Sequence, residues 1–120
     1  IEPHVKKLLV LLRALGPKIV VITDGSNGAY VYDEQDAMWY MPIYPDIKPA
    51  LERTGAGDAF AATFTSALAL GHDVQTALRW APINAMSVTQ EIGAQKGLLT
   101  AEGIEKFLKL APVDYTPIKI

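Results

Sequence analysis

The apolar positions at the start of the chain change from a helical spacing to that of a buried strand. Between residues 5 and 15 they recur every three or four positions, as on one face of a helix, and Gly16 and Pro17 end the pattern. The next apolar run, Ile19–Ile22, is continuous and β-branched. Such a run predicts a strand covered on both faces, as in a parallel sheet between helices. Turn-forming residues then gather at 23–28.

A second change of pattern predicts a hairpin and then an irregular stretch. Ala29–Tyr32 and Met38–Met41 are short strand-like segments separated by a polar link, which predicts that they pair as a hairpin. Pro42, Pro45 and Pro49 follow, and prolines at this density interrupt both helices and sheets. We therefore expect an extended, irregular approach to residue 52.

Three helical patterns occupy the second half of the chain. The first, Ala56–Leu70, is rich in apolar residues on all sides and is expected to be largely buried. Asp73 is expected to cap the second helix, which runs to Val88 with a kink at Pro82. Thr100 is expected to cap the third, and a loop over residues 93–97 separates the last two helices.

Composition predicts one globular core and excludes several classes of partner. The 120 residues are 50% hydrophobic and 20% charged, which is typical of one domain. With 11 basic against 13 acidic residues and no basic cluster, the chain lacks the charge pattern of a nucleic-acid or membrane-surface protein, so small molecules are the expected partners. The absence of cysteine excludes disulfides and favours a cytoplasmic protein. Because the chain begins without Met, inside a helical pattern, we expect it to be a fragment.

The strongest chemical signal lies where the irregular stretch becomes a helix. Residues 52–60 read Glu-Arg-Thr-Gly-Ala-Gly-Asp-Ala-Phe. Gly55, Ala56 and Gly57 have little or no side chain, so their N–H groups can approach an anion closely, and the helix dipole adds to the attraction. Asp58 would repel a phosphate, which suggests that it takes a proton from a hydroxyl beside the anion. An ordinary helix start with an acidic first turn would give the same pattern.

Two common phosphate-binding motifs are absent from the sequence. No Gly-Lys dipeptide occurs, which excludes a P-loop. Phe60 stands where the dinucleotide-binding fingerprint requires glycine. A phosphate would therefore be bound in another way.

Three segments, in the same order, resemble the PfkB (ribokinase-like) family of carbohydrate and nucleoside kinases. Thr54–Phe60 is similar to the family's C-terminal signature. Val21–Ala29 resembles the strand and glycine loop at the nucleotide phosphates, and Asn84–Thr89 with 93–95 resembles the helix and loop under the base. The resemblance implies an α/β fold, the C-terminal part of a ribokinase-like three-layer α/β/α sandwich with a mainly parallel sheet. Residues 1–120 would form a single partial domain, the nucleotide-binding half of such a kinase.

The activity that the resemblance implies is ATP-dependent phosphoryl transfer to a hydroxyl of a sugar or nucleoside, with Mg²⁺ accompanying the nucleotide. Asp58 would be the general base. Gly55, Ala56 and Gly57 would form the anion hole that neutralises charge on the transferred phosphoryl group. By matching, the nucleotide would be bound by Thr23, Asp24, Gly25, Ser26, Gly28, Asn84 and Ser87.

The resemblance also implies a monovalent cation such as K⁺ beside the anion hole. By matching, its ligands would be Glu52, Thr54, Ser87, Gln90 and Gly93. The chain departs from the usual family pattern at three positions, where the family has Asp for Glu52, Thr or Pro for Arg53, and Gly for Thr63. The family's N-terminal half, with its acceptor-binding residues, has no counterpart here. A missing N-terminal half or a homo-oligomer would have to complete the site.

Several alternatives stay open. Asn84 could be a polar residue satisfied against a neighbouring loop. Trp39, Tyr40 and Trp80 are expected to be packing residues. The chain could be a catalytically silent nucleotide-binding or regulatory domain, a structural fragment without activity, or a kinase acting on a vitamin precursor. The phosphoryl donor could be ADP.

Overall fold

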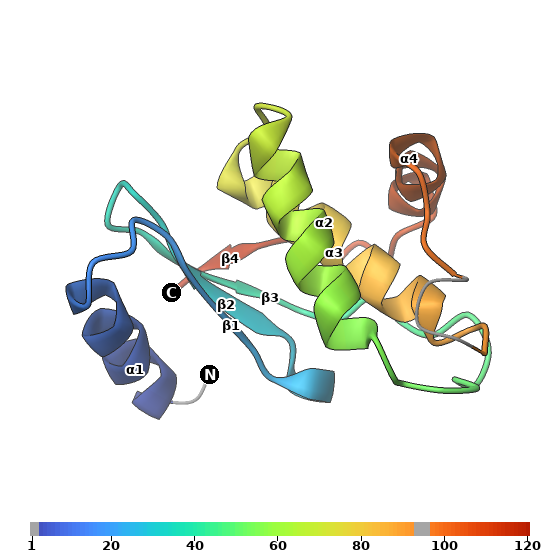
Figure 1. Ribbon diagram of the computed structural model, residues 1–120, viewed down its shortest axis with the longest axis horizontal. Coiled ribbons are helices and arrows are strands. Elements are labelled where there is room, and N and C mark those ends of the chain that lie inside the picture. Colours follow the sequence, from blue (N-terminus) through green and yellow to red (C-terminus); the bar gives the residue numbers. More distant parts are fainter. Residues whose placement is uncertain (1–2, 93–96) are drawn as a thin grey trace. The chain divides into compact units, whose positions relative to one another are not determined.

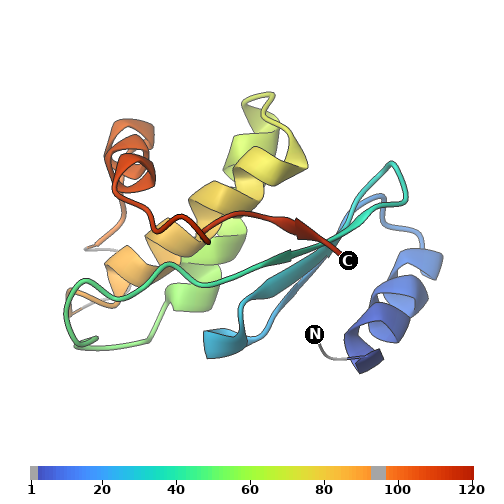
Figure 2. The same ribbon diagram turned by 180° about the vertical axis from the view of Figure 1, so that it is seen from behind.

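In the computed structural model, which describes residues 3–92 and 97–120, the strands and the last three helices belong to two separate units (Figures 1 and 2). Unit 1 comprises the chain up to Pro42 together with Pro117–Ile120. Unit 2 comprises Ile43–Thr116. No helix within the described ranges is long and apolar enough to cross a membrane.

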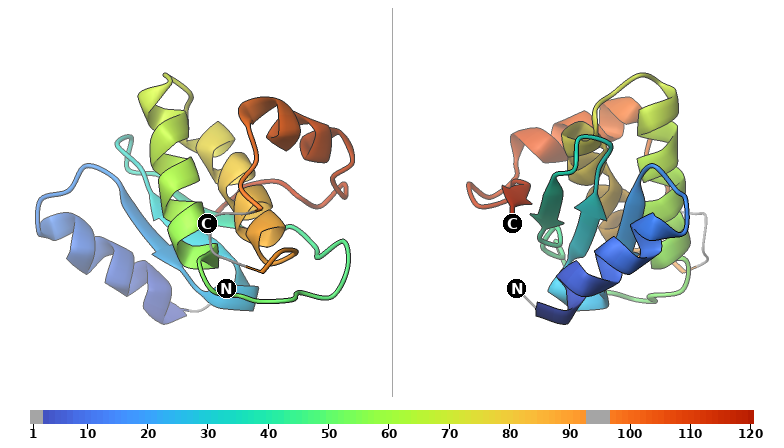
Figure 3. Two further views of the ribbon diagram at one scale, coloured as in Figure 1. Left: turned by 45° about the vertical axis from the view of Figure 1, so that its right-hand side comes forward. Right: turned by 90° about the vertical axis from the view of Figure 1, so that its left-hand side faces the viewer.

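Unit 1 is an antiparallel sheet with a helix along one face (Figure 3). Its strands are β1 (Val20–Thr23), β2 (Ala29–Tyr32), β3 (Met38–Met41) and β4 (Ile118–Lys119), hydrogen-bonded in that order. A 3-10 turn, η1 (Gly25–Asn27), joins the first two strands, and the helix is α1 (Pro3–Ala14). The expected hairpin of β2 and β3 is confirmed, with the boundaries that the sequence indicated.

The strand register places the core of unit 1 on the face covered by α1. Ile22 is paired with Tyr30, and Tyr30 with Tyr40, so these side chains lie on the same face of the sheet. Val5 and Leu9 of α1 are buried in the same cluster. The helical spacing of the first apolar positions therefore serves to cover this face.

The expectation of a mainly parallel sheet is wrong for the described strands, because every pairing is antiparallel. Parallel neighbours need a crossover of a dozen or more residues, whereas only residues 24–28 and 33–37 connect the first three strands. The predicted burial of Ile19–Ile22 on both faces is also wrong. Val20 is buried, Ile22 is half-buried and Thr23 is exposed, because β1 lies at one end of the strand order.

Unit 2 is a group of three helices, α2 (Ala56–Ala69), α3 (Val74–Val88) and α4 (Ala101–Lys109). The predicted caps are confirmed. The Asp73 carboxylate accepts a hydrogen bond from Thr76 N at 2.8 Å, and Thr100 Oγ1 accepts one from Gly103 N at 3.2 Å. α3 continues as a helix through Pro82.

The expectation that α2 is largely buried is met only in part. α2 buries one side, with Phe60 and Phe64 stacked at 6.4 Å between ring centroids, while residues such as Ala61 and Ala62 are exposed. Trp80 is buried as predicted. β4 carries no recognisable strand pattern and was not expected, and residues 93–96 of the predicted loop lie outside the described residues.

Candidate functional site

The first turn of α2 has the geometry of an anion-binding site. Gly55 precedes the helix in the left-handed conformation, at φ 87°. Its carbonyl accepts the hydrogen bond of Ala59 N at 2.8 Å, and Ala56 N donates to Arg53 O at 3.3 Å. The helical ladder offers no acceptor to the N–H groups of Gly57 and Asp58, which lie between them. These donors and the positive end of the helix dipole would attract an anion.

Gly57 has open space in front of it. A Cβ placed there would meet no described atom within 4 Å outside its own helix and neighbours. Glycine inside a helix costs about 1 kcal/mol relative to alanine. Packing within the protein therefore gives no reason for glycine at this position, whereas the close approach of an external group would.

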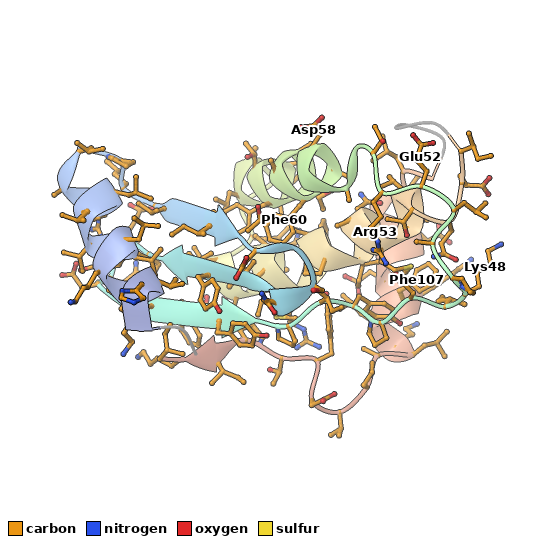
Figure 4. All side chains as sticks on the ribbon, turned by 90° about the horizontal axis from the view of Figure 1, so that it is seen from below. Lys48, Glu52, Arg53, Asp58, Phe60 and Phe107 are labelled. Atoms are coloured by element: carbon orange, nitrogen blue, oxygen red, sulfur yellow. The ribbon has the colours of Figure 1, made fainter. Side chains whose placement is uncertain are left out.

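Asp58 lies beside this open surface. Its side chain is exposed and points away from α2, on the side opposite Phe60 (Figure 4). Among the residues that the structure describes, none forms a hydrogen bond or an ion pair with its carboxylate. Phe60 is 6% exposed and anchors the helix, so the same turn both fixes α2 and presents a carboxylate to solvent.

The C-terminal end of α3 holds the segment that leads to Gly55. Thr89 O accepts hydrogen bonds from Leu51 N at 2.7 Å and Glu52 N at 3.3 Å. Gln90 Nε2 donates to Lys48 O at 3.0 Å. Two of the predicted cation ligands, Glu52 and Gln90, thus lie on neighbouring segments, which these hydrogen bonds join.

Among the predicted ligands of a monovalent cation, one buried oxygen atom supports such a site. Gln90 Oε1 is buried and has no hydrogen-bond partner within the described residues, and such an oxygen can bind a cation or a donor. Ser87 Oγ donates to Gly97 O at 2.7 Å, Thr54 is exposed, and Gly93 lies outside the described residues. The described chain contains no group of three or more acidic or histidine side chains suited to a metal.

Arg53, one of the departures from the family pattern, is turned toward Asp46. Their side chains form an ion pair at 3.2 Å, with the arginine 72% exposed. A pair this exposed contributes about 0–1 kcal/mol. Its partner is thus an acidic residue of the proline-rich segment, which makes a local ion pair the observed role of Arg53.

The predicted nucleotide loop of unit 1 is held by its own backbone and by a side chain of β3. Asp24 N donates to Gly28 O at 2.8 Å, and the Tyr40 hydroxyl donates to Asn27 O at 2.9 Å. Gly28 is buried at φ 97°, and a Cβ there would overlap Met41 O. Residues 23–26 are exposed. The loop therefore presents Thr23, Asp24, Gly25 and Ser26 to solvent, while Gly28 has a structural reason to be glycine.

Asn84 is engaged inside unit 2. It is 5% exposed, its Nδ2 donates to Thr63 Oγ1 at 2.9 Å, and its Oδ1 accepts from Leu99 N at 2.8 Å. These bonds match the alternative of a polar residue satisfied against a loop, and a contact with a nucleotide stays a prediction. Sequence reasoning did not pair Thr63 with Asn84. The available signal was two polar residues at positions where their helices are otherwise apolar.

The chain is similar in sequence to known sugar and nucleoside kinases. The chain is 38% identical over 95 residues to a ribokinase of Bacillus subtilis, covering 79% of this chain and 31% of the relative. It is 32% identical over 97 residues to a nucleoside kinase of Methanothermobacter thermautotrophicus, covering 80% and 30%. The chain thus spans about a third of the length of these relatives.

Solved structures show the same fold. A ribokinase of Arabidopsis thaliana complexed with ribose and ATP matches with a TM-score of 0.81 and 27% identity, covering 91% of this chain and 35% of that one. A putative ribokinase II from E. coli in complex with ATP and Mg²⁺ matches with a TM-score of 0.79 and 25% identity, covering 88% and 33%. The predicted α/β class and the ribokinase-like fold are therefore confirmed, and the chain is a part of that fold.

A family model described as pfkB family carbohydrate kinase matches residues 2–101. That range includes the glycine loop of unit 1, the first turn of α2 and the whole of α3. The resemblance first seen in three short segments thus extends over most of the sequence, and the chain belongs to the pfkB family of carbohydrate kinases.

Proposed function

We propose that this chain supplies the phosphoryl-transfer end of a kinase that phosphorylates a hydroxyl of a sugar or nucleoside with ATP. The observation that carries the proposal is the first turn of α2. There a left-handed Gly55, unpaired N–H groups and open space at Gly57 adjoin an exposed carboxylate at Asp58. The sugar and nucleoside kinases among its relatives support the same reaction class.

Asp58 is the proposed general base. A carboxylate without a partner among the described residues can accept the proton of an acceptor hydroxyl, and the deprotonated oxygen then attacks the terminal phosphoryl group. The N–H groups of Gly57 and Asp58 would face the transferred phosphoryl group and stabilise the charge that gathers on its oxygens during transfer. Base and anion donors belong to one rigid turn, which fixes the distance between them.

The exposed residues 23–26 are the proposed contacts of the nucleotide. Their backbone is already ordered by the hydrogen bonds of the loop, so binding would cost little further entropy. Mg²⁺ bound to the phosphates would neutralise part of their charge. The described residues offer no acidic cluster to bind Mg²⁺. The phosphate oxygens of the nucleotide would therefore supply most of its ligands.

K⁺ is proposed as a further ion near Gln90, whose buried Oε1 has no donor among the described residues. The acceptor-binding residues would come from the part of the relatives' length that this chain does not match, or from a second copy of the chain. For this reason the choice between sugar and nucleoside belongs to the complete enzyme.

The test is calorimetric titration of the chain with ATP and Mg²⁺, run beside an Asp58→Asn variant. We expect both proteins to bind, because Asp58 acts on the acceptor and not on the phosphates. In an assay of transfer to D-ribose and adenosine, the variant should lose at least about a hundredfold in rate wherever the unmodified chain is active.

The outcomes separate the alternatives. Binding without transfer in the unmodified chain would favour a silent nucleotide-binding domain. The absence of ATP binding in both proteins would overturn the proposal for this chain and favour a structural fragment. Equal transfer rates in both would remove Asp58 from the role of base.

A further inference from the structure

A polar groove lies between α3 and α4 of unit 2, and none of the residues predicted for the anion, the nucleotide or the cation lines it. The two helices are in contact (Figure 3). The groove has a volume of about 350 Å³, which is within the range of small-molecule sites. Its lining consists of three residues from each helix: Thr76, Arg79, Trp80, Glu105, Leu108 and Lys109.

The helical spacing explains why these residues share one groove. On each helix, the second and third lining residues follow the first by three and four positions, so all three lie on one face. Trp80 is 6% exposed and Arg79 is half-buried, whereas Glu105 and Lys109 are exposed. The groove thus has a buried side on α3 and a charged rim on α4.

The groove contains donors and charges that no described residue satisfies. Arg79 Nε and Trp80 Nε1 are buried and have no hydrogen-bond partner within the described ranges. Glu105 and Lys109 are four positions apart on α4, yet neither they nor the Arg79 guanidinium form an ion pair with any residue that the structure describes. A buried donor without an acceptor is unfavourable, so a ligand, an ion or water is expected to supply one.

Trp39 shows how the other indole of the chain is satisfied. Its Nε1 donates to Asp33 Oδ2 at 2.9 Å, inside unit 1. The chain contains two tryptophans, so Trp80 is the indole whose N–H group lacks an acceptor among the described residues. Trp39 therefore provides an internal control for any ligand that reaches the groove.

The charges of the groove indicate which ligand would fit. Arg79 and Lys109 are cationic, and a guanidinium binds a carboxylate through two parallel N–H groups. Glu105 would repel a ligand that is anionic throughout, and it would attract a hydrogen-bond donor such as an ammonium or hydroxyl group. The complement of two cations and one carboxylate is a molecule with two carboxylates and one such donor.

We propose that this groove binds a small dicarboxylate that also carries an ammonium or hydroxyl group. Arg79 and Lys109 bind the carboxylates, and Glu105 accepts from the donor. Because Arg79 Nε and Trp80 Nε1 are covered, the exposed Glu105 and Lys109 side chains turn outward to admit the ligand. The inference does not depend on the proposed phosphoryl transfer, in which no residue of the groove takes part.

The main test is an NMR titration of the isotope-labelled chain with L-glutamate, in a buffer without phosphate at neutral pH. The indole N–H signal of Trp80 and the Nε–H signal of Arg79 should shift together and saturate with a dissociation constant of about 1 mM. The indole signal of Trp39 should not move, because its N–H group is already bonded to Asp33. An unchanged Trp80 signal would overturn the proposal and leave water as the partner of the buried donors.

Glutarate is the matched ligand, because it lacks only the ammonium group of L-glutamate. We expect glutarate to bind about threefold more weakly, since Glu105 would face no donor. In Glu105→Gln, the affinities for the two ligands should agree to within about twofold. If glutarate or inorganic phosphate bound the unmodified chain as tightly as L-glutamate, the groove would be a general anion site and the proposal would be overturned.

Variants of the two cations test which side chains bind. Arg79→Gln should weaken L-glutamate binding by about tenfold or more, and Lys109→Gln by about threefold. Lys106→Gln is the matched control, because Lys106 is an exposed lysine of α4 that does not line the groove. Circular dichroism checks that the helices remain intact. Equal affinities in Lys109→Gln and Lys106→Gln would contradict the assigned contacts.

This proposal and the proposed function can fail separately. The titration with L-glutamate contains no nucleotide, so a chain that fails to bind ATP would overturn the proposed function and leave this test unaffected. Conversely, ATP binding without any response of Trp80 to L-glutamate would overturn the present proposal alone.

Discussion

Unit 1 and unit 2 each contain a glycine and an aspartate at notable positions, and the surroundings of the two pairs differ. In unit 1, Gly28 lies against Met41 O, and Asp33, which is 3% exposed, is surrounded by donors. In unit 2, open space lies in front of Gly57, and the Asp58 carboxylate is exposed. Gly28 and Asp33 are enclosed by other residues of unit 1, whereas the residues that the structure describes neither enclose Gly57 nor bond the Asp58 carboxylate.

The Asp33 carboxylate forms its hydrogen bonds with neighbouring residues of unit 1. Its carboxylate accepts from Gln35 N and Ala37 N, each at 2.9 Å, and from Trp39 Nε1 at 2.9 Å. In the first turn of α2, a helical glycine lowers stability, and neither the two N–H groups nor the carboxylate forms a hydrogen bond within the described residues that would compensate for it. The contrast indicates that Gly28 and Asp33 serve the fold of unit 1, whereas the described packing gives no such role to Gly57 and Asp58 and leaves them accessible to a ligand.

The largest effect is expected for Gly28→Ala, which should destabilise unit 1 by about 3 kcal/mol or more, because strain at positive φ adds to the overlap with Met41 O. Urea unfolding followed by circular dichroism measures it. Gly16→Ala is the matched control, since Gly16 has φ 124° but no atom within 4 Å of the added Cβ. A cost no greater than that of Gly16→Ala would show that the close contact is unimportant.

Asp33→Asn should have the next largest effect, about 2 kcal/mol at neutral pH, because one of the donors would face an amide N–H. Burial raises the pKa of Asp33, but the hydrogen bonds from Trp39, Ala37 and Gln35 outweigh it and hold the pKa below its ordinary value of 3.8.

The sign of the pH dependence follows from that shift. A carboxyl whose pKa is lower in the folded state stabilises the protein above the pKa of the unfolded state, and this contribution is lost as the pH falls through the folded value. The unmodified chain should therefore lose more stability than Asp33→Asn when urea unfolding is repeated below pH 4. Parallel losses in the two proteins would contradict the assignment.

Gly57→Ala should have the smallest effect on stability and the opposite sign. The chain should gain up to about 1 kcal/mol, because alanine favours the helix and the Cβ has room. The affinity for ATP with Mg²⁺ should nevertheless fall about tenfold, because the Cβ would occupy the approach of the phosphate. Gly103→Ala, in the first turn of α4, should gain similar stability without loss of affinity. If Gly57→Ala bound ATP as tightly as the unmodified chain, Gly57 would not be a glycine for the sake of a ligand, and the contrast with Gly28 would be contradicted.

The sequence predicted features that depend on neighbours along the chain. The hairpin of β2 and β3, the Asp73 and Thr100 caps, and the helix start after Gly55 all appear where the pattern placed them. Each is determined by residues a few positions apart, because turns, caps and amphipathic spacing are local interactions. The motif at Thr54–Phe60 is likewise recognised from residues that are neighbours in the sequence.

Features that depend on distant residues were predicted poorly. β4 pairs with β3 although Tyr40 and Ile118 are far apart in sequence, and the strand direction followed from short links and not from the apolar run. The roles of Asn84 and Thr63 became visible only as a pair, because neither residue type identifies its partner.

The sequence alone thus indicated the family, most of the local elements and the residues Gly55–Asp58 that we propose for phosphoryl transfer. Tertiary structure alone decided which glycines are enclosed and which face open space, and which polar side chains are satisfied by the protein. The physical reason is that a side chain's chemistry is fixed by its type, whereas its availability to a ligand depends on the atoms that packing brings around it.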